Sequence, residues 1–138
     1  MILLDTSFLF AIKAEKDKNY QRANEILDIL IAQYNELKII PYSVLNETIT
    51  LAVARFNANK HYLKTYYDLF WGSERFFEII GFEIKEYSKI SQVLIKYCSG
   101  KKKLSFTDAS LIYIYEKYDA KAIVSFDSHF DNILTRLF

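Results

Sequence analysis

Short apolar runs that alternate with helix-like segments constrain the fold of this chain more than any other feature. The run Met1–Leu4 is wholly apolar and is followed at once by Asp5, a pattern that predicts a strand buried on both faces of a parallel sheet. Three further strands are predicted at Lys38–Pro41, Phe76–Ile80 and Ala122–Phe126. Strands that alternate with helices predict an α/β domain with a mainly parallel central sheet.

The segments between these strands have apolar residues spaced three and four apart, which predicts amphipathic helices. Ser43 is the expected N-cap of one helix, and Ser105 with Asp108 resembles a capping box in front of another. The pair Gly72-Ser73 is expected to end a third helix. The predicted helices are Asn19–Tyr34, Val44–Asn57, Lys60–Phe70, Lys85–Cys98 and Ala109–Tyr118.

Length, charge and cysteine content limit the class of protein. A chain of 138 residues with 51% hydrophobic residues predicts one domain over residues 1–138. The net charge of +1 gives no bulk attraction to nucleic acid, so binding RNA would need a local patch or a bound metal. The single cysteine, Cys98, excludes an intramolecular disulfide and fits a reducing compartment. Asp5 and Lys13 interrupt the apolar N-terminus, and no apolar run is long enough to span a membrane, so we expect a cytoplasmic protein.

Four acidic residues fall where the predicted fold would bring them together. Asp5 and Asp127 follow the first and fourth strands, while Glu47 and Asp108 lie early in two helices. Ligands of open parallel sheets bind at the carboxyl ends of the strands. Carboxylates crowded there repel one another and call for a cation, and oxygen ligands favour Mg²⁺ or Mn²⁺. The expected chemistry is metal-assisted hydrolysis, in which a bound water attacks phosphorus in line.

Each acid taken alone also has a structural explanation. Asp108 could favour a helix N-terminus, Asp127 could form an Asx-turn, and Glu47 could lie on a solvated face. A cap is the structural alternative for Asp5, but this residue lies between an apolar strand and an apolar helix start. The structural explanations are therefore weaker for the set than for any single member.

The acidic residues belong to four short motifs in a fixed order. These are Asp5-Thr6-Ser7, Val44-Leu45-Asn46-Glu47, Leu104-Ser105-Phe106-Thr107-Asp108-Ala109 and Ser125-Phe126-Asp127-Ser128-His129-Phe130. In order and spacing they resemble the motifs of PIN (PilT N-terminus) domains, particularly the small VapC-type toxins. The resemblance covers essentially the whole chain, and its specificity comes from the ordered set rather than from any one motif.

The resemblance implies a three-layer α/β/α fold and a Mg²⁺- or Mn²⁺-dependent endoribonuclease. It also implies a homodimer that a small antitoxin protein inhibits. Matched position by position, the acidic quartet that would hold the metal and activate water is Asp5, Glu47, Asp108 and Asp127. Thr6 and Ser125 match the hydroxyl positions that steady these acids.

Several polar residues near the motifs have two interpretations. The lysines Lys101, Lys102 and Lys103 could hold an RNA backbone through its phosphates, or form an ordinary solvated loop. Asp131 could support the site, but a helix-cap charge is favoured because surface acids are usually solvated. His129, two residues after Asp127, could approach the substrate, although a role in the turn is favoured.

One predicted helix is unusually aromatic. Tyr62, Tyr66 and Phe70 share one stripe of this helix, and the next stripe holds Leu63, Tyr67 and Trp71. Core packing is the favoured interpretation of this wide apolar arc. An exposed strip for a second copy or an antitoxin helix, and base stacking on RNA, are the alternatives.

Three other functions compete with the ribonuclease. The first is a PIN-like module that binds RNA or protein without hydrolysis, although such a module has no reason to keep four crowded acids. A haloacid-dehalogenase-like phosphatase would need an Asp where Ser7 stands. A response-regulator receiver would need an acidic pair near the end of the first strand and a lysine directly after a late strand, and both are missing.

Overall fold

The structure, a computed structural model that describes residues 1–138, is built on one sheet of five parallel strands. The strands are β1 (Ile2–Leu4), β2 (Lys38–Pro41), β3 (Glu78–Ile80), β4 (Ala122–Val124) and β5 (Arg136–Leu137). Their order across the sheet is β3-β2-β1-β4-β5, which places β1 at the centre with all three residues buried. The predicted α/β fold with a mainly parallel sheet is confirmed.

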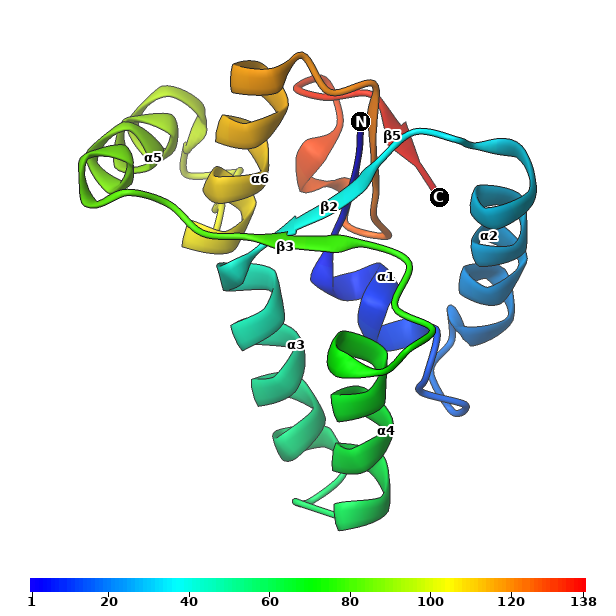
Figure 1. Cartoon of the computed structure of the whole chain (residues 1–138). Helices are drawn as coiled ribbons and strands as arrows, with labels where there is room; N and C mark the ends of the chain where they lie inside the picture. Colours follow the sequence, from blue (N-terminus) through cyan, green and yellow to red (C-terminus); the bar gives the residue numbers. More distant parts are fainter.

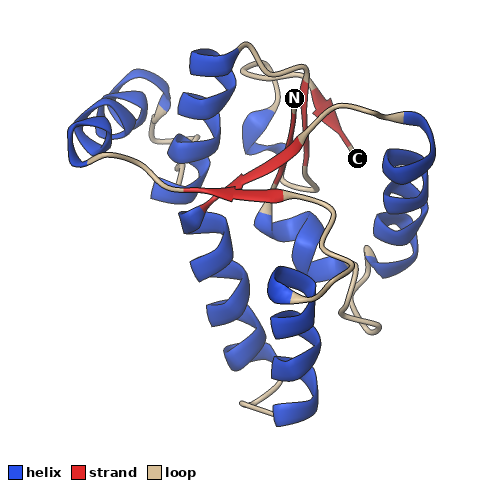
Figure 2. Cartoon of the chain, in the orientation of Figure 1, coloured by secondary structure: helices blue, strands red, loops and turns tan.

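Six α-helices and one short 3₁₀ helix surround the sheet. They are α1 (Thr6–Ala11), α2 (Tyr20–Gln33), α3 (Tyr42–Arg55), α4 (Lys60–Trp71), α5 (Ile84–Tyr97), α6 (Phe106–Tyr118) and η1 (Ser128–Phe130). Helices α5 and α6 lie on one side of the sheet and α2 on the other, while α3 and α4 project beyond its lower edge (Figure 1). Helices make up most of the regular structure (Figure 2). None of them is long and apolar enough to cross a membrane.

The start of α3 differs from the prediction. Pro41 is both the last residue of β2 and the N-cap of α3, so the helix begins at Tyr42. Ser43 was predicted as the N-cap, and this was wrong, because its hydroxyl lies buried without a hydrogen-bond partner inside the first turn. The helix also ends earlier than predicted, at Arg55, since Asn57 turns into the left-handed region with φ 49°.

The predicted strands were partly too long, and one strand was missed. Only Glu78–Ile80 pairs in the third strand, against the predicted Phe76–Ile80. The fourth strand ends at Val124 rather than Phe126, because the chain turns at Ser125. Strand β5 was not predicted, since two residues show no periodicity and only pairing with β4 identifies them as a strand.

Helix α4 explains why its aromatic residues divide between core and surface. Tyr66 and Phe70 are completely buried, and the Tyr66 hydroxyl donates a hydrogen bond to the Phe10 carbonyl at 2.7 Å. Tyr67 and Trp71, from the second stripe, are more than half exposed. Gly72 ends the helix as predicted, and a Cβ there would lie 2.4 Å from the Asp68 carbonyl oxygen, which leaves no room for a side chain.

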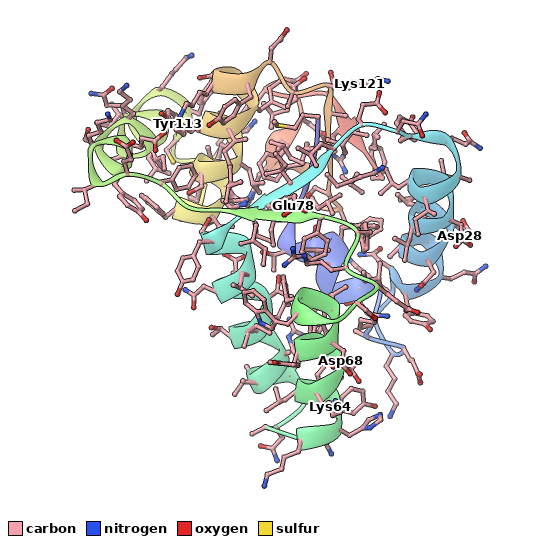
Figure 3. The ribbon with its side chains drawn as sticks, in the orientation of Figure 1. Asp28, Lys64, Asp68, Glu78, Tyr113 and Lys121 are labelled. Atoms are coloured by element: carbon pink, nitrogen blue, oxygen red, sulfur yellow. The ribbon has the colours of Figure 1, made fainter.

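A buried carboxylate joins α5 to α6. Glu86 accepts hydrogen bonds from the Tyr113 hydroxyl at 3.0 Å and from the Lys117 ammonium at 2.5 Å. It also accepts one from the backbone N–H of Glu83, which completes a capping box at the start of α5. The Lys117 hydrogen bond is the main cause that lowers the pKa of Glu86 to about 2. Figure 3 labels Tyr113 between the two helices that this cluster holds together.

Candidate active site

The acidic motifs gather at the carboxyl edge of the sheet. Strands β1 and β4 are parallel neighbours, and the backbone N–H of Asp5 donates to the Val124 carbonyl at 3.0 Å. The chain that leaves β4 therefore passes directly beside Asp5. Helix α1 begins at the same edge, with Asp5 as its N-cap. This arrangement follows from parallel pairing, because the carboxyl ends of adjacent parallel strands lie together.

Asp5 is a buried carboxylate with one oxygen held and the other free. It is 4% exposed, and its Oδ2 accepts hydrogen bonds at 2.7 Å from the hydroxyls of both Ser7 and Ser125. Its Oδ1 receives no hydrogen bond. Burial outweighs the two serine hydrogen bonds and, with a smaller contribution from the charge of Asp108, raises the pKa of Asp5 to about 6.

One of the two hydroxyls that bond Asp5 differs from the prediction, which named Thr6 and Ser125. Ser7 donates to the Asp5 carboxylate, whereas the Thr6 hydroxyl is buried and forms no hydrogen bond. Ser7 Oγ also accepts from the backbone N–H of Phe126 at 3.0 Å, so it links the loop after β1 to the loop after β4. The signal in the sequence was the spacing, since a Ser two residues after an N-cap Asp lies in the first turn of the helix, within reach of the carboxylate.

Ser125 has the position that the motif predicted for it. Its hydroxyl is buried, donates to Asp5, and accepts from the backbone N–H of Asp127 at 2.9 Å. Ser125 therefore couples the orientation of Asp5 to the turn that carries Asp127.

Asp108 lies at the N-terminus of α6. Its Oδ2 accepts from the backbone N–H of Ser105 at 2.7 Å, and its own N–H donates to Ser105 Oγ at 3.0 Å, which is the predicted capping box. Burial is the main cause that raises the pKa of Asp108, and the negative charges of Asp127 and Glu47 raise it further. As at Asp5, one oxygen of the carboxylate, Oδ1, receives no hydrogen bond.

The carboxylate of Asp127 is contacted by both the backbone and the imidazole of His129. Its Oδ1 accepts from the backbone N–H of His129 at 2.8 Å, and its Oδ2 lies 3.3 Å from the imidazole Nδ1. The same Nδ1 is 3.9 Å from Oδ2 of Asp108 and makes no hydrogen bond. The imidazole therefore lies next to two acids of the quartet, a position that an isolated His in the sequence did not reveal.

Glu47 is the most exposed of the four acids. It lies in the second turn of α3, and its charge acts on Asp108. The charges of the four predicted acids are thus linked through Asp108, which interacts with Asp5, Asp127 and Glu47.

The carboxylate oxygens of this cluster are the type of ligand that binds a hard divalent cation. Their side chains do not converge on a single position. No group of three or more His, Cys, Asp or Glu side chains is arranged to hold an ion. However, Asp5 and Asp108 each present a carboxylate oxygen without a hydrogen bond, and the pKa of both is raised. Oxygen donors of this kind are the ligands that Mg²⁺ and Mn²⁺ prefer. The residues present therefore fit such an ion.

Asp131 lies close to the acid cluster in sequence but is paired with Arg136. Asp131 forms two hydrogen bonds with the Arg136 guanidinium, at 2.7 and 3.1 Å, and Arg136 also donates to the Ser125 carbonyl. The Arg136 hydrogen bonds lower the pKa of Asp131, which acts as an anchor for the last strand rather than as a member of the acid cluster.

The three lysines have different surroundings. The Lys102 ammonium donates to the Asp131 carbonyl at 3.1 Å, which fixes the loop before α6 against the loop after η1. Lys101 and Lys103 are exposed, and their ammonium groups make no ion pair. The loop therefore presents two free positive charges on the approach to α6.

Comparisons with known proteins agree with this architecture. The family model of the PIN domain matches residues 2–134, so the chain belongs to the PIN domain family. A search of curated proteins gives no match.

Two solved structures share the fold. VapC20 from Mycobacterium tuberculosis, described as a sarcin-ricin loop cleaving toxin, superposes with a TM-score of 0.73 at 20% identity, over 93% of this chain and 91% of that one. PAE2754 from Pyrobaculum aerophilum superposes with a TM-score of 0.54 at 17% identity, over 93% and 80% of the two chains. The expected PIN-like fold, similar to that of a VapC toxin, is confirmed.

Proposed function

We propose that this protein is a divalent-metal-dependent endoribonuclease that hydrolyses RNA phosphodiester bonds. Membership of the PIN domain family, whose members are generally nucleases, supports this assignment. The observation that carries it is the cluster of acids at the carboxyl edge of the sheet, where the pKa of Asp5 and of Asp108 is raised and no basic residue neutralises the buried Asp5. Burial makes the charged form of these carboxyl groups unfavourable, and acids with raised pKa values are concentrated at functional sites.

The site has the groups that this reaction needs. Bound Mg²⁺ or Mn²⁺ would polarise a phosphoryl oxygen and lower the pKa of a water molecule. The free oxygens of Asp5 and Asp108 would hold the ion, and Asp127 and Glu47 would contribute directly or through water. Ser7 and Ser125 orient the Asp5 carboxylate by hydrogen bonds to Oδ2, which leaves Oδ1 available. One of the four carboxylates would accept the proton of the attacking water.

We further propose that the protein acts in the cytoplasm as the toxin of a VapBC-type pair, as a homodimer inhibited by a small antitoxin. The fold shared with the VapC20 toxin supports the toxin assignment. A surface that could join two copies lies on α5, where Ile84 and Ile95 are 89% and 83% exposed. Between them, the hydroxyls of Ser88 and Ser91 are bonded to carbonyls of their own helix, so burying this face would leave no unpaired hydroxyl.

Cleavage of a pool of structured RNAs tests the proposed function. The purified protein, stripped of any co-purifying partner, is assayed with Mn²⁺, with Mg²⁺ and with EDTA. The matched variants are Asp108→Asn in the cluster and Asp28→Asn, which removes an exposed carboxylate on α2 far from the sheet edge (Figure 3). Cleavage that requires the metal, survives in Asp28→Asn and is lost in Asp108→Asn is the expected result. A protein that binds RNA or protein but cuts nothing would instead be a non-catalytic PIN-like module.

A further inference from the structure

The imidazole of His129 has a buried nitrogen that nothing in the chain satisfies. Its Nδ1 lies 3.3 Å from Oδ2 of Asp127 and 3.9 Å from Oδ2 of Asp108, yet it forms no hydrogen bond. The shorter distance is close to that of a hydrogen bond, so the direction of the ring is the main obstacle. A buried polar atom without a partner is costly, and this one needs an explanation.

Both tautomers of the ring leave Nδ1 unsatisfied. If Nδ1 carries the proton, its N–H does not point at the oxygen of Asp127. If Nδ1 instead has a free lone pair, this lone pair lies beside two carboxylate oxygens, which are also electron-rich. A cation bound by all three atoms would resolve the second arrangement, because neutral imidazole and ionised carboxylates are both metal ligands.

The spacing of the three atoms suits a shared cation. Around an octahedral ion with bonds of about 2.1 Å, neighbouring ligand atoms lie about 3.0 Å apart and opposite ones about 4.2 Å apart. The two distances from Nδ1, 3.3 and 3.9 Å, fall within this range. The side chains do not form a closed site, but the His129 side chain is 42% exposed, so packing leaves its ring space to turn.

The backbone holds His129 beside the acids. Its N–H donates to Oδ1 of Asp127 at 2.8 Å, and the N–H of Asp127 donates to Ser125 Oγ at 2.9 Å. The next residue, Phe130, is completely buried in the core. The turn that carries the imidazole is therefore fixed on both sides, and the place of the ring beside two acids is a property of the fold.

An ordinary ion pair is the competing explanation. A protonated imidazole would neutralise Asp127 in place of a metal ion. In such a pair the N–H is normally directed at the carboxylate, as the Arg136 guanidinium is toward Asp131 at 2.7 and 3.1 Å. The Nδ1 of His129 makes no such hydrogen bond. The geometry therefore favours a lone pair that faces a cation.

We propose that His129 is a further ligand of the divalent metal, bound through Nδ1 next to Asp108 and Asp127, and that it makes the site prefer a first-row transition metal such as Mn²⁺ over Mg²⁺. This inference rests on the proposed function, whose metal site it extends, and adds which ion the site selects. Mg²⁺ takes oxygen ligands, whereas imidazole nitrogen is a common ligand of transition metals. One nitrogen among oxygens therefore discriminates against Mg²⁺.

Electron spin echo spectroscopy of bound Mn²⁺ tests this ligand directly, because a coordinated imidazole gives a nitrogen modulation. The chain has only two histidines, His61 and His129, so the untagged protein has only two imidazoles that could give the signal. We expect the modulation in the parent protein and its loss in His129→Gln. The matched control is His61→Gln, which changes an exposed histidine in the first turn of α4, at the tip of the projecting α3–α4 pair (Figure 1). It should keep the modulation.

Titration calorimetry of the same proteins measures the selectivity. His129→Gln and His129→Ala should weaken Mn²⁺ binding by about 10-fold or more and change Mg²⁺ binding by less than about 3-fold. Equal losses for the two ions would overturn the selectivity. Mn²⁺ binding that is unchanged or tighter in both variants would overturn the ligand, because the imidazole would then be a cationic partner of Asp127 that competes with the metal. Thermal unfolding in EDTA shows whether each variant is folded.

The two measurements separate this inference from the proposed function. Mn²⁺-dependent cleavage of RNA, with bound Mn²⁺ that shows no nitrogen modulation, would retain the nuclease and reject the His129 ligand. A modulation that is lost in His129→Gln, in a protein that cuts no RNA, would retain the ligand and reject the nuclease. A parent protein that binds neither Mn²⁺ nor Mg²⁺ would reject the metal site of the proposed function and this ligand with it.

Discussion

Two buried carboxylates in this protein, Asp5 and Glu86, have opposite surroundings. Both are less than a tenth exposed. Glu86 is paired with Lys117, and this hydrogen bond lowers its pKa to about 2. Asp5 accepts only neutral serine hydroxyls and a backbone N–H, faces the charge of Asp108, and has a pKa raised to about 6.

The difference distinguishes an acid that is neutralised within the fold from one that is not. Glu86 is neutralised by Lys117 of the same chain, and this ion pair joins α5 to α6. Glu86 therefore needs no further cation. Asp5 and Asp108 have no cation paired with them in the chain and repel each other, which is the charge balance expected if they bind a cation from outside. Variants of Glu86 and of the acid cluster should therefore respond differently to metal, to its removal and to pH.

The largest expected effect is on catalysis. Asp108→Asn should lower the rate of metal-dependent RNA cleavage by about 100-fold or more, because it removes a charge that in the proposed site would hold the ion. Glu86→Gln should leave the rate within about 2-fold, since this carboxylate serves only α5 and α6. Initial rates at saturating Mn²⁺ measure both. Equal losses in the two variants would show that the contrast between the two acids has no functional meaning.

The second effect is on the stability of the metal-free protein. Asp5→Asn and Glu86→Gln should change the free energy of unfolding in opposite directions. In EDTA at pH 7 or above, Asp5→Asn should stabilise the fold by about 1 to 3 kcal/mol, because a buried carboxylate with a raised pKa becomes neutral. Asn can still cap α1 and accept from the two serines. Glu86→Gln should instead lower the melting temperature by several degrees. Urea unfolding and thermal scans measure these changes, and destabilisation by Asp5→Asn would contradict the prediction.

The third effect concerns the hydroxyls around Asp5. Ser7→Ala should weaken Mn²⁺ binding by about 10-fold, since it removes a hydrogen bond that orients the carboxylate. Thr6→Val should leave Mn²⁺ binding unchanged, because the Thr6 hydroxyl is buried without a partner and Val has the same shape. Titration calorimetry with Mn²⁺ compares the two. A loss in Thr6→Val that matched Ser7→Ala would restore the role that the motif assigned to Thr6.

The smallest effect is the slope of stability with pH in the metal-free protein. Folded Asp5 keeps its proton to about pH 6, whereas the ordinary pKa is 3.8, so its contribution makes stability fall as the pH rises through this window. The slope from one such group is at most about 1.4 kcal/mol per pH unit. Glu86 has a pKa lowered from 4.5 to about 2, so its contribution is lost as the pH falls below about 4.5.

Urea unfolding at a series of pH values measures these slopes. Asp5→Asn should remove the fall in stability between about pH 4 and about pH 6, while Glu86→Gln should reduce the loss at lower pH. A parent protein whose stability rose between about pH 4 and about pH 6, with no change in Asp5→Asn, would contradict the burial of Asp5 as an unpaired acid.

Much of the fold could be predicted from periodicity alone. All five predicted helices are present. They were predictable because a long helix that buries one face repeats its apolar residues with a period of 3.6. The apolar run before Asp5 identified the central strand because a strand buried on both faces has apolar residues at every position. Strand β5 could not be predicted, since it exists only through its pairing with β4. Ser43 looked like an N-cap, but the sequence could not show that Pro41 ends β2 and starts α3 without a loop.

The candidate site was predictable to a different extent. The sequence determined which acids could cooperate, because their positions after strands and at helix starts follow from local pattern. Only the tertiary structure decided that Ser7 links the loop after β1 to the loop after β4, that His129 lies near Asp108 as well as Asp127, and which of two buried acids lacks a cation. Those outcomes depend on distances between residues far apart in the chain, such as the 3.0 Å between the backbone N of Phe126 and Ser7 Oγ. Local pattern sets the elements, whereas the charge balance of a buried group is set by what packs against it.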